Sequence, residues 1–220
     1  MAERKPLARA WTLAAVAAIV VGAGAGAGFA LTHRSGSSQP ASTVTGHANV
    51  VWPAAKRRAP DFALRDQTGA PISLRAQRGQ IVILTFIDPV CTTLCPLEAK
   101  ALDQVVQQLP GAQRPAVVAV SVNPWGDEAR FFRADAHKWR LGPSWRWAIG
   151  SKAQLARVWR AYAIAVRIRL FRAAGVTTHR VDHTEVAYVI DRRGFERALF
   201  AYPFSPADVE NTVRQLDHPA

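Results

Sequence analysis

The chain has 220 residues, of which 49% are hydrophobic and seven are tryptophan, so it is expected to form one domain with a sizeable buried core plus accessory segments. Its formal net charge of +12 favours an anionic lipid surface or an acidic partner protein, unless the arginines are simply solvated. An export segment at the N-terminus argues against nucleic acid as a partner despite this charge.

The first 32 residues are typical of an export or anchor segment. Residues 1–10 carry Arg4, Lys5 and Arg9, and this positive flank is expected to stay in the cytoplasm. The uncharged stretch 11–32 would span about 33 Å as a helix, enough to cross a bilayer core. Its small residues also allow cleavage by signal peptidase, but the run is longer than a usual signal-peptide core. We therefore expect a single-pass anchor in the cell membrane, with the functional domain on the extracytoplasmic side.

The rest of the chain divides into a linker and a domain. Residues 33–58 are rich in Ser, Thr, Gly, Pro and Ala and have no sustained apolar period, which predicts a flexible linker. Residues 59–220 alternate apolar runs with amphipathic stretches and form the predicted functional domain. Its strands are predicted at 81–86, 116–122, 184–190 and 195–202, and its helices at 97–109, 127–139, 151–162 and from 205 onwards.

Local signals support these elements. The first two strands are unbroken β-branched runs, the pattern of strands buried on both faces. Ser151 and Gln154 match a capping box at a helix start. The turn 191–194 makes the last two strands antiparallel neighbours. A β-α-β half followed by a β-β-α half predicts an α/β, thioredoxin-like fold with a central mixed sheet flanked by helices, and such sheets place their chemistry beyond the carboxyl ends of the strands.

Packing roles are predicted for most other apolar side chains. In the helix at 97–109, five residues are expected on one buried side: Leu97, Leu102, Val105, Val106 and Leu109. Three tryptophans are expected to be core or sheet-edge residues: Trp145, Trp147 and Trp159. From Val166 to Arg172, apolar residues alternate with arginine, which predicts a strand or hairpin with one basic face, either a docking surface or a solvated one.

The two cysteines follow the first predicted strand directly. If Cys91 and Cys95 both lie on the first turn of the next helix, their spacing puts them on one face with Cβ atoms about 6 Å apart. Their sulfurs can then bind one soft ion, and the helix N-terminus lowers their thiol pKa values. Pro96 fits a first helical turn. A disulfide across so short a loop would stabilise little, so we expect either a metal role or a redox role.

His183 is the histidine best placed to join the cysteines, because it lies just before another predicted strand. His179 would be about 13 Å away on an extended strand, too far to share one ion, and is interpreted as a loop residue. His137 is expected on a helix surface. The remaining histidines lie in the linker or tail: His33, His47 and His218.

The pattern Cys91-x-x-x-Cys95-Pro96 after an apolar strand, with Val-Asp-His183-Thr before another, resembles the Sco/SenC family. Members of that family are thioredoxin-fold, membrane-anchored, copper-binding factors that help to assemble the copper centre of cytochrome c oxidase. The resemblance runs from about Ala59 to Leu216. It implies that Cys91, Cys95 and His183 bind Cu(I) or Cu(II).

The sequence departs from the family at two places. Asp88-Pro89-Val90 stands where the family usually has an aromatic-Thr pair before the first cysteine, and Asn123-Pro124 stands where it often has Asp-Pro. These departures concern the partner surface and redox tuning more than the ligand set. Zinc would need a fourth ligand, which Asp88 could supply, but Asp88 is expected to cap the following turn.

Related thiol proteins fit the sequence less well. A peroxiredoxin would need proline at position 88, seven residues before Cys95, but Asp88 is there. A thioredoxin oxidoreductase is typically marked by a Cys-x-x-Cys pair that faces a cis-proline. In this chain three residues separate the cysteines, and no proline lies between Pro143 and Pro203. Two thiolates and one imidazole suit copper on chemical grounds.

The leading hypothesis is a membrane-anchored copper-binding protein that delivers copper to, or prepares, the copper-containing subunit of cytochrome c oxidase or another copper protein. It would act by ligand exchange, with no small-molecule substrate and no enzymatic turnover. The alternatives are a thiol-disulfide oxidoreductase, whose redox pair would be Cys91 and Cys95, and a copper or redox sensor.

If the stretch 11–32 is retained as an anchor, the protein is expected at full mass in the membrane fraction after carbonate extraction, because its apolar surface holds it in the bilayer. Deleting residues 1–40 should leave a folded, soluble domain, since this part carries no recognisable core. Immunoblotting of the fractions checks both statements. A soluble mature form that begins near residue 30 would contradict the retained anchor.

Overall fold

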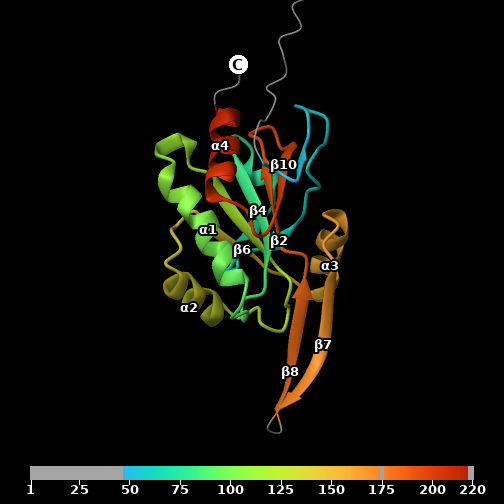
Figure 1. Ribbon diagram of the computed structural model, residues 1–220. Coiled ribbons are helices and arrows are strands. Elements are labelled where there is room, and N and C mark those ends of the chain that lie inside the picture. The colour runs from blue at the N-terminus through green and yellow to red at the C-terminus, as the bar shows by residue number, and fades with distance from the viewer. Residues whose placement is uncertain (1–46, 174–175, 218–220) are drawn as a thin grey trace, which may run out of the picture. The chain divides into compact units, whose positions relative to one another are not determined.

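The centre of the domain is a six-stranded mixed β-sheet (Figure 1). The computed structural model describes residues 47–173 and 176–217. The strands stand in the order β1–β10–β9–β4–β5–β6; β4, β5 and β6 are parallel, and the other neighbours are antiparallel. Their bounds are Val50–Val51 (β1), Val82–Ile87 (β4), Ala116–Ser121 (β5), Trp145–Ala148 (β6), Val186–Ile190 (β9) and Glu196–Ala201 (β10).

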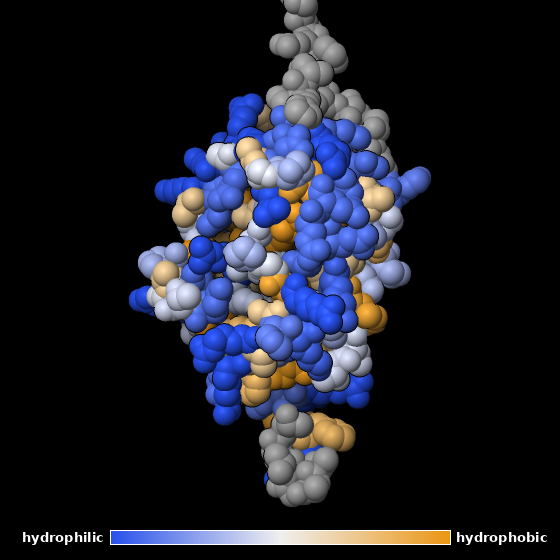
Figure 2. Space-filling view, turned by 90° about the vertical axis from the view of Figure 1, so that its left-hand side faces the viewer, coloured by the Kyte–Doolittle hydropathy of each residue, from blue (hydrophilic) through white to orange (hydrophobic). Residues whose placement is uncertain are grey.

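Helices cover both faces of this sheet. Helices α1, α2 and α4 lie on one side, and α3 lies on the other (Figure 1). The outer surface of the three-helix side is largely hydrophilic (Figure 2), so these helices turn their apolar faces toward the sheet. The bounds are Cys95–Gln108 (α1), Ala129–Trp139 (α2), Lys152–Ala161 (α3) and Pro206–Asp217 (α4), with short 3₁₀ helices at Arg75–Gln77 (η1) and Gly111–Gln113 (η2).

Strand β4 supplies side chains to a core on each face. Ile83 and Ile87 pack on the α1 side, whereas Leu84 and Phe86 pack on the α3 side. Successive side chains of a strand point to opposite faces, so a strand covered on both faces is an unbroken apolar run, as the sequence predicts here. Thr85 is the exception, because it is polar, fully buried and directed toward α1.

The three tryptophans assigned to packing are core residues, as predicted. Trp145 and Trp147 of β6 are buried, and the ring centroid of Trp147 lies 4.9 Å from that of Phe132 in α2. Trp159 of α3 is buried in the opposite core, and its indole N–H donates a 2.9 Å hydrogen bond to the Ser121 carbonyl.

Local signals in the sequence predict the ends of several elements correctly. Ser151 Oγ accepts a hydrogen bond from Gln154 N at 3.3 Å, and Gln154 Oε1 accepts one from Ser151 N at 2.9 Å, which confirms the capping box. Gly194 closes the turn before β10 by donating to the Asp191 carbonyl at 2.8 Å, with a φ of 82° that glycine adopts without strain. The predicted strands and helices are confirmed in their order, with most bounds within about two residues, but strand β6 was not predicted.

Helix α1 differs from its predicted form at its N-terminal end. It begins at Cys95, two residues earlier than the predicted start at Leu97. Leu97 is 50% exposed, so its predicted place on the buried side is wrong. The reason is geometric: Leu97 lies five residues before Leu102, which places it about 140° around the helix from the buried stripe.

The structure describes part of the predicted linker and none of the predicted anchor. Within the stretch 33–58, predicted as a linker, Val50–Val51 form β1 at the edge of the sheet, and Trp52 stacks on Tyr188 with ring centroids 6.3 Å apart. The predicted anchor, 11–32, lies outside the described residues. Within the ranges given above, no helix is long and apolar enough to cross a bilayer.

A long antiparallel hairpin extends beyond the sheet (Figure 1). Paired residues of such a hairpin share a face, so the pairs Arg167–Asp182 and Arg169–Arg180 give it the basic face predicted from the alternating sequence. His179 lies within its second strand, so its predicted loop position is wrong. The hairpin strands are Val166–Ala173 (β7) and Val176–His183 (β8), and a second, small ribbon pairs Leu64–Arg65 (β2) with Pro71–Ile72 (β3).

Candidate metal centre

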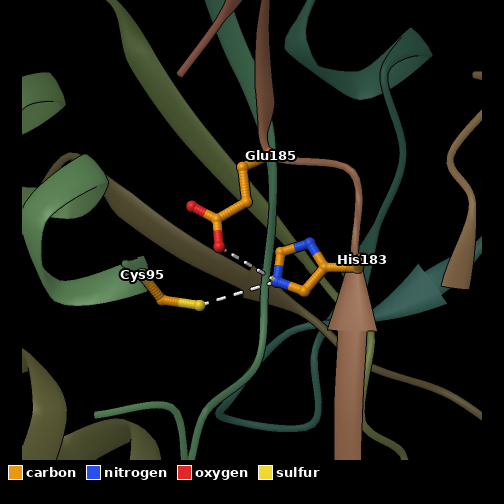
Figure 3. A group of neighbouring side chains, drawn as sticks. All are labelled: Cys95, His183 and Glu185. Atoms are coloured by element: carbon orange, nitrogen blue, oxygen red, sulfur yellow. Dashed lines mark hydrogen bonds and ion pairs between the residues drawn. The ribbon is translucent and has the colours of Figure 1, made fainter. Parts of the chain in front are cut away.

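The candidate metal-binding residues meet beyond the carboxyl end of β4. Cys95 is the first residue of α1 and is fully buried, His183 is the last residue of β8, and Glu185 lies between β8 and β9. Their side chains point toward one another (Figure 3). Cys91 lies in the loop before α1, so the condition considered from the sequence, that both cysteines stand on the first helical turn, is not met.

Asp88 organises the loop that carries Cys91. Its Oδ1 atom accepts hydrogen bonds of 3.0 Å from the backbone N–H of Val90 and from Nδ2 of Asn123, which follows β5. Its carbonyl accepts a third, of 3.1 Å, from the N–H of Cys91. Asp88 therefore caps the turn after β4, as the sequence predicts, and ties this loop to the end of the neighbouring strand.

His183 presents its Nε2 atom to Cys95, with 3.6 Å between Nε2 and Sγ. Its Nδ1 atom lies 3.1 Å from the Thr184 carbonyl oxygen. A carbonyl oxygen only accepts, so Nδ1 carries the proton and the Nε2 lone pair is available to a thiol or a metal. The imidazole is 3% exposed, and burial lowers the pKa of His183 below 6.5, so the ring is neutral at neutral pH.

Glu185 is a residue of this centre that sequence reasoning missed. Its Oε1 atom is 3.9 Å from His183 Nε2, and these two atoms and Cys95 Sγ all lie within 4.8 Å of one another. The other carboxylate oxygen, Oε2, is buried without a hydrogen-bond partner among the described residues. The available signal was an acidic residue two positions after the histidine, because alternate residues of an extended segment point the same way.

The two cysteines differ in protonation. A hydrogen bond from the Cys95 thiol lowers the pKa of Cys91 to about 4. The same hydrogen bond, followed by burial, raises the pKa of Cys95 above its ordinary value. At neutral pH the pair therefore holds a thiolate on Cys91 and a thiol on Cys95. Of the three predicted ligands, Cys95 and His183 are in direct contact, and Cys91 lies beside Cys95 but outside the group of converging donor atoms.

Several carboxyl groups near the thiols have raised pKa values. Burial raises the pKa of Glu98 to about 8 and that of Glu185 to about 7. Burial likewise raises the pKa of Asp127 to about 7 and that of Asp135 to about 6. Removal from water disfavours the ionised form of each acid. At neutral pH these acids therefore carry less negative charge than exposed carboxylates would, whereas Cys91 is ionised.

Glu98 is fully buried three residues after Cys95. Its Oε1 atom accepts a 2.6 Å hydrogen bond from the Thr85 hydroxyl, which also lies 3.2 Å from the Val186 carbonyl oxygen. One hydroxyl proton cannot serve both acceptors fully. A protonated Glu98 resolves this competition, because it can donate to Thr85 and leave the Thr85 proton for Val186.

A groove of about 560 Å³ lies between the loop of Cys91 and the hairpin. Cys91 lines one wall, and Phe171 and Arg180 line the other. The hairpin contacts the body of the domain where His179 stacks on Trp125, with ring centroids 4.0 Å apart and planes inclined by 7°. The groove therefore gives a partner molecule access to the sulfur of Cys91.

The comparison with known proteins identifies relatives of most of the chain. The family model described as SCO1/SenC matches residues 53–217. The mitochondrial protein SCO2 homolog of Bos taurus is 30% identical over 166 residues, which cover 70% of this chain and 58% of the bovine protein. The match therefore spans less than two thirds of that relative's length.

Solved structures share the fold. Bradyrhizobium japonicum ScoI, solved with copper bound, superposes with a TM-score of 0.63 at 19% identity, covering 72% of this chain and 99% of that one. BsSco, described as having a disulfide switch and as a member of the Sco family of cytochrome c oxidase assembly proteins, gives 0.60 at 17% identity over 76% and 96%. At these identities the likeness shows the fold alone, a mixed α/β domain.

Substituting Glu98 with glutamine is expected to change how stability depends on pH. Between about pH 4.5 and 8, Glu98 is protonated when folded and ionised when unfolded, so unfolding releases a proton. This contribution to the free energy of unfolding falls by up to about 1.4 kcal/mol per pH unit as pH rises through that window. Glu98→Gln removes it, so the variant should gain stability relative to the wild type as pH rises.

Urea unfolding at several pH values measures this difference, and subtraction of the two curves isolates Glu98 from the other titrating groups. Glu210→Gln is the matched control, because Glu210 pairs with Arg214 at the surface of α4. Parallel curves for Glu98→Gln and the wild type would contradict a protonated, buried Glu98.

Proposed function

This chain belongs to the SCO1/SenC family, and from that premise we propose that it is a copper-binding assembly factor that delivers copper to, or prepares, the copper centre of cytochrome c oxidase. Its copper ligands are Cys91, Cys95 and His183. The observation that carries the proposal is the 3.6 Å contact between Cys95 Sγ and His183 Nε2, with the proton of the ring held at Nδ1.

The donor set suits copper. Thiolate sulfur is a soft ligand that favours Cu(I), and imidazole serves both Cu(I) and Cu(II). The thiolate of Cys91 is already ionised, whereas Cys95 must release its proton when it binds the ion. Three ligands leave the ion open to exchange, which a protein that passes copper on requires.

The position of the ligands supports transfer by ligand exchange. Cys91 is half-buried and faces the groove, whereas Cys95 and the ring of His183 are buried behind it. An incoming ligand of the acceptor protein reaches the copper from the Cys91 side, so Cys91 is replaced first. The acceptor is the copper-containing subunit of cytochrome c oxidase or another copper protein, and no small-molecule substrate is involved.

The chemistry of relatives agrees with this proposal. Bradyrhizobium japonicum ScoI was solved with copper bound, and BsSco is described as one of the cytochrome c oxidase assembly proteins. Under this proposal the segment 11–32 holds the domain at the cell membrane, on the extracytoplasmic side. That location would bring the groove within reach of a membrane-bound oxidase.

Thiol-disulfide exchange is the second candidate function, and the protonation of the cysteines favours it. The Cys91 thiolate would attack a partner disulfide, and the Cys95 sulfur would then displace the partner, losing its proton. The products are the Cys91–Cys95 disulfide and two partner thiols, a balanced two-electron exchange. A copper or redox sensor would use the same residues.

Cys91→Ser and Cys95→Ser are each expected to abolish tight Cu(I) binding, with a loss larger than the roughly 10–100-fold caused by removing a supporting group. Anaerobic titration of the reduced domain with Cu(I) against a competing chelator measures this loss. Thr92→Ala, in the same loop, is the control. Uptake of one equivalent of copper by the oxidised Cys91–Cys95 disulfide would show that the ligand assignment is wrong.

The same reduced domain separates the two functions when it is mixed with an apo copper-site domain. Transfer of copper supports the assembly factor, and transfer of electrons without copper supports the reductase.

His183→Ala is expected to weaken Cu(II) binding most, because two thiolates can still hold some Cu(I). Formation of the Cys91–Cys95 disulfide should be unaffected, since thiol exchange needs no imidazole ligand. His179→Ala is the matched control, because it removes another imidazole of the same strand. The His179 ring stacks on Trp125. The Cu(II)–thiolate absorption band and thermal unfolding are measured on one sample. A well-folded His183→Ala protein with an unchanged band would favour the reductase.

A further inference from the structure

We propose that Glu185 is a fourth ligand, which binds copper in its oxidised state, Cu(II), and contributes little to binding Cu(I). This inference rests on the proposed function, because it adds a residue to the copper site formed by Cys91, Cys95 and His183. Its consequence is a site that distinguishes the two oxidation states of copper through one carboxylate.

The geometry of Glu185 fits a metal ligand. Bonds of about 2.0–2.3 Å to one ion place neighbouring donor atoms about 3–4 Å apart. The observed separations are 3.6 Å between Cys95 Sγ and His183 Nε2, and 3.9 Å between His183 Nε2 and Glu185 Oε1. These donor atoms come from α1, from β8 and from the segment before β9, and in Figure 3 the Cys95 sulfur and a Glu185 oxygen both face the same ring nitrogen of His183.

The surroundings of Glu185 satisfy its carboxylate only in part. Its side chain is 14% exposed, and Oε2 is buried without a hydrogen-bond partner among the described residues. Its Oε1 atom faces His183 Nε2, which has a lone pair because Nδ1 carries the ring proton. Two lone pairs that face each other in a buried site repel unless a proton or a cation lies between them. A bound cation satisfies all three donor atoms.

The chemistry of the donor atom explains the preference for Cu(II). Oxygen and nitrogen donors suit Cu(II), whereas Cu(I) is satisfied by thiolates and imidazole. With both thiolates and Glu185 bound, Cu(II) leaves a net charge of −1 on the site and Cu(I) leaves −2. Burial makes the second state more costly. Glu185 should therefore bind Cu(II) and should not be a ligand of Cu(I).

Neighbouring acids do not share these features. Asp182, directly before His183, is 44% exposed and forms ion pairs with Arg169 at 3.2 Å and with Arg180 at 3.7 Å. Asp88 Oδ1 accepts two hydrogen bonds that hold its own loop. Asp182→Asn thus removes one negative charge beside the same histidine without touching the converging donors, and it serves as the matched control.

The test measures Cu(II) and Cu(I) affinities of the full-length chain by chelator competition, together with the Cu(II) electron paramagnetic resonance spectrum. Glu185→Gln keeps the size of the side chain and removes the anionic donor. We expect its Cu(II) affinity to fall at least about 10-fold with an altered spectrum, while its Cu(I) affinity changes less than about threefold. Asp182→Asn should leave both affinities within about threefold.

Glu185→Asp, which keeps the carboxylate on a shorter side chain, tests the same point if Glu185→Gln folds poorly, and thermal unfolding of each apo variant decides which one is used. The aspartate variant should retain part of the Cu(II) affinity and show a shifted spectrum. An unchanged Cu(II) affinity and spectrum in the folded variant, or an equal loss for Cu(I) and Cu(II), would overturn the role of Glu185.

Cys95→Ser in the same assay shows whether a negative result concerns Glu185 alone or the whole proposed copper site. If Cys95→Ser loses copper of both oxidation states while Glu185→Gln behaves as the wild type, the copper site stands and Glu185 is not its ligand. If neither substitution changes copper affinity, the copper site itself is wrong, and the inference falls with it.

Discussion

Burial of β4 on both faces is the constraint on which the candidate metal centre depends. This strand lies between β5 and β9, and its side chains fill the cores on both sides, so its neighbours are held in one register. Strand β9 runs antiparallel to β4 and pairs Ala187 with Thr85. The residues before β9 therefore lie beside those that follow β4. This register brings His183 and Glu185 of one segment to Cys95 of the other.

Burial also fixes the protonation of the centre. The backbone hydrogen bond of His183 Nδ1 leaves a lone pair at Nε2, and the thiol pair shares one proton between a thiolate and a buried thiol. A bound metal ion would replace that proton, and oxidation to a disulfide would release it, so the proposed copper transfer and thiol exchange would use the same arrangement of Cys91 and Cys95. Only His183 and Glu185 distinguish the two, because thiol exchange requires neither an imidazole nor a carboxylate ligand.

The hairpin connects the centre to the groove beside Cys91. Its second strand ends at His183, so a displacement of the hairpin would also move this proposed ligand. Asp182 pairs with Arg169 and Arg180 on the basic face, and His179 stacks on Trp125 from the loop after β5. Of these contacts, the His179–Trp125 stack joins the hairpin to the body of the domain beside the groove. A molecule that binds in the groove would therefore meet both Cys91 and Arg180.

The sequence by itself predicted most strands and helices in their order, though not β6, and it predicted the two-sided burial of β4, because apolar periodicity is a local property of the chain. Motif spacing, which is also local, singled out Cys91, Cys95 and His183 as candidate ligands. Only the tertiary structure decided that Cys91 precedes the helix, that His183 exposes Nε2 and that Glu185 joins Cys95. These features depend on strand register and on burial, which bring residues distant in sequence to one place. A carboxylate two residues from a histidine acquires a role only when the fold places a sulfur across from it.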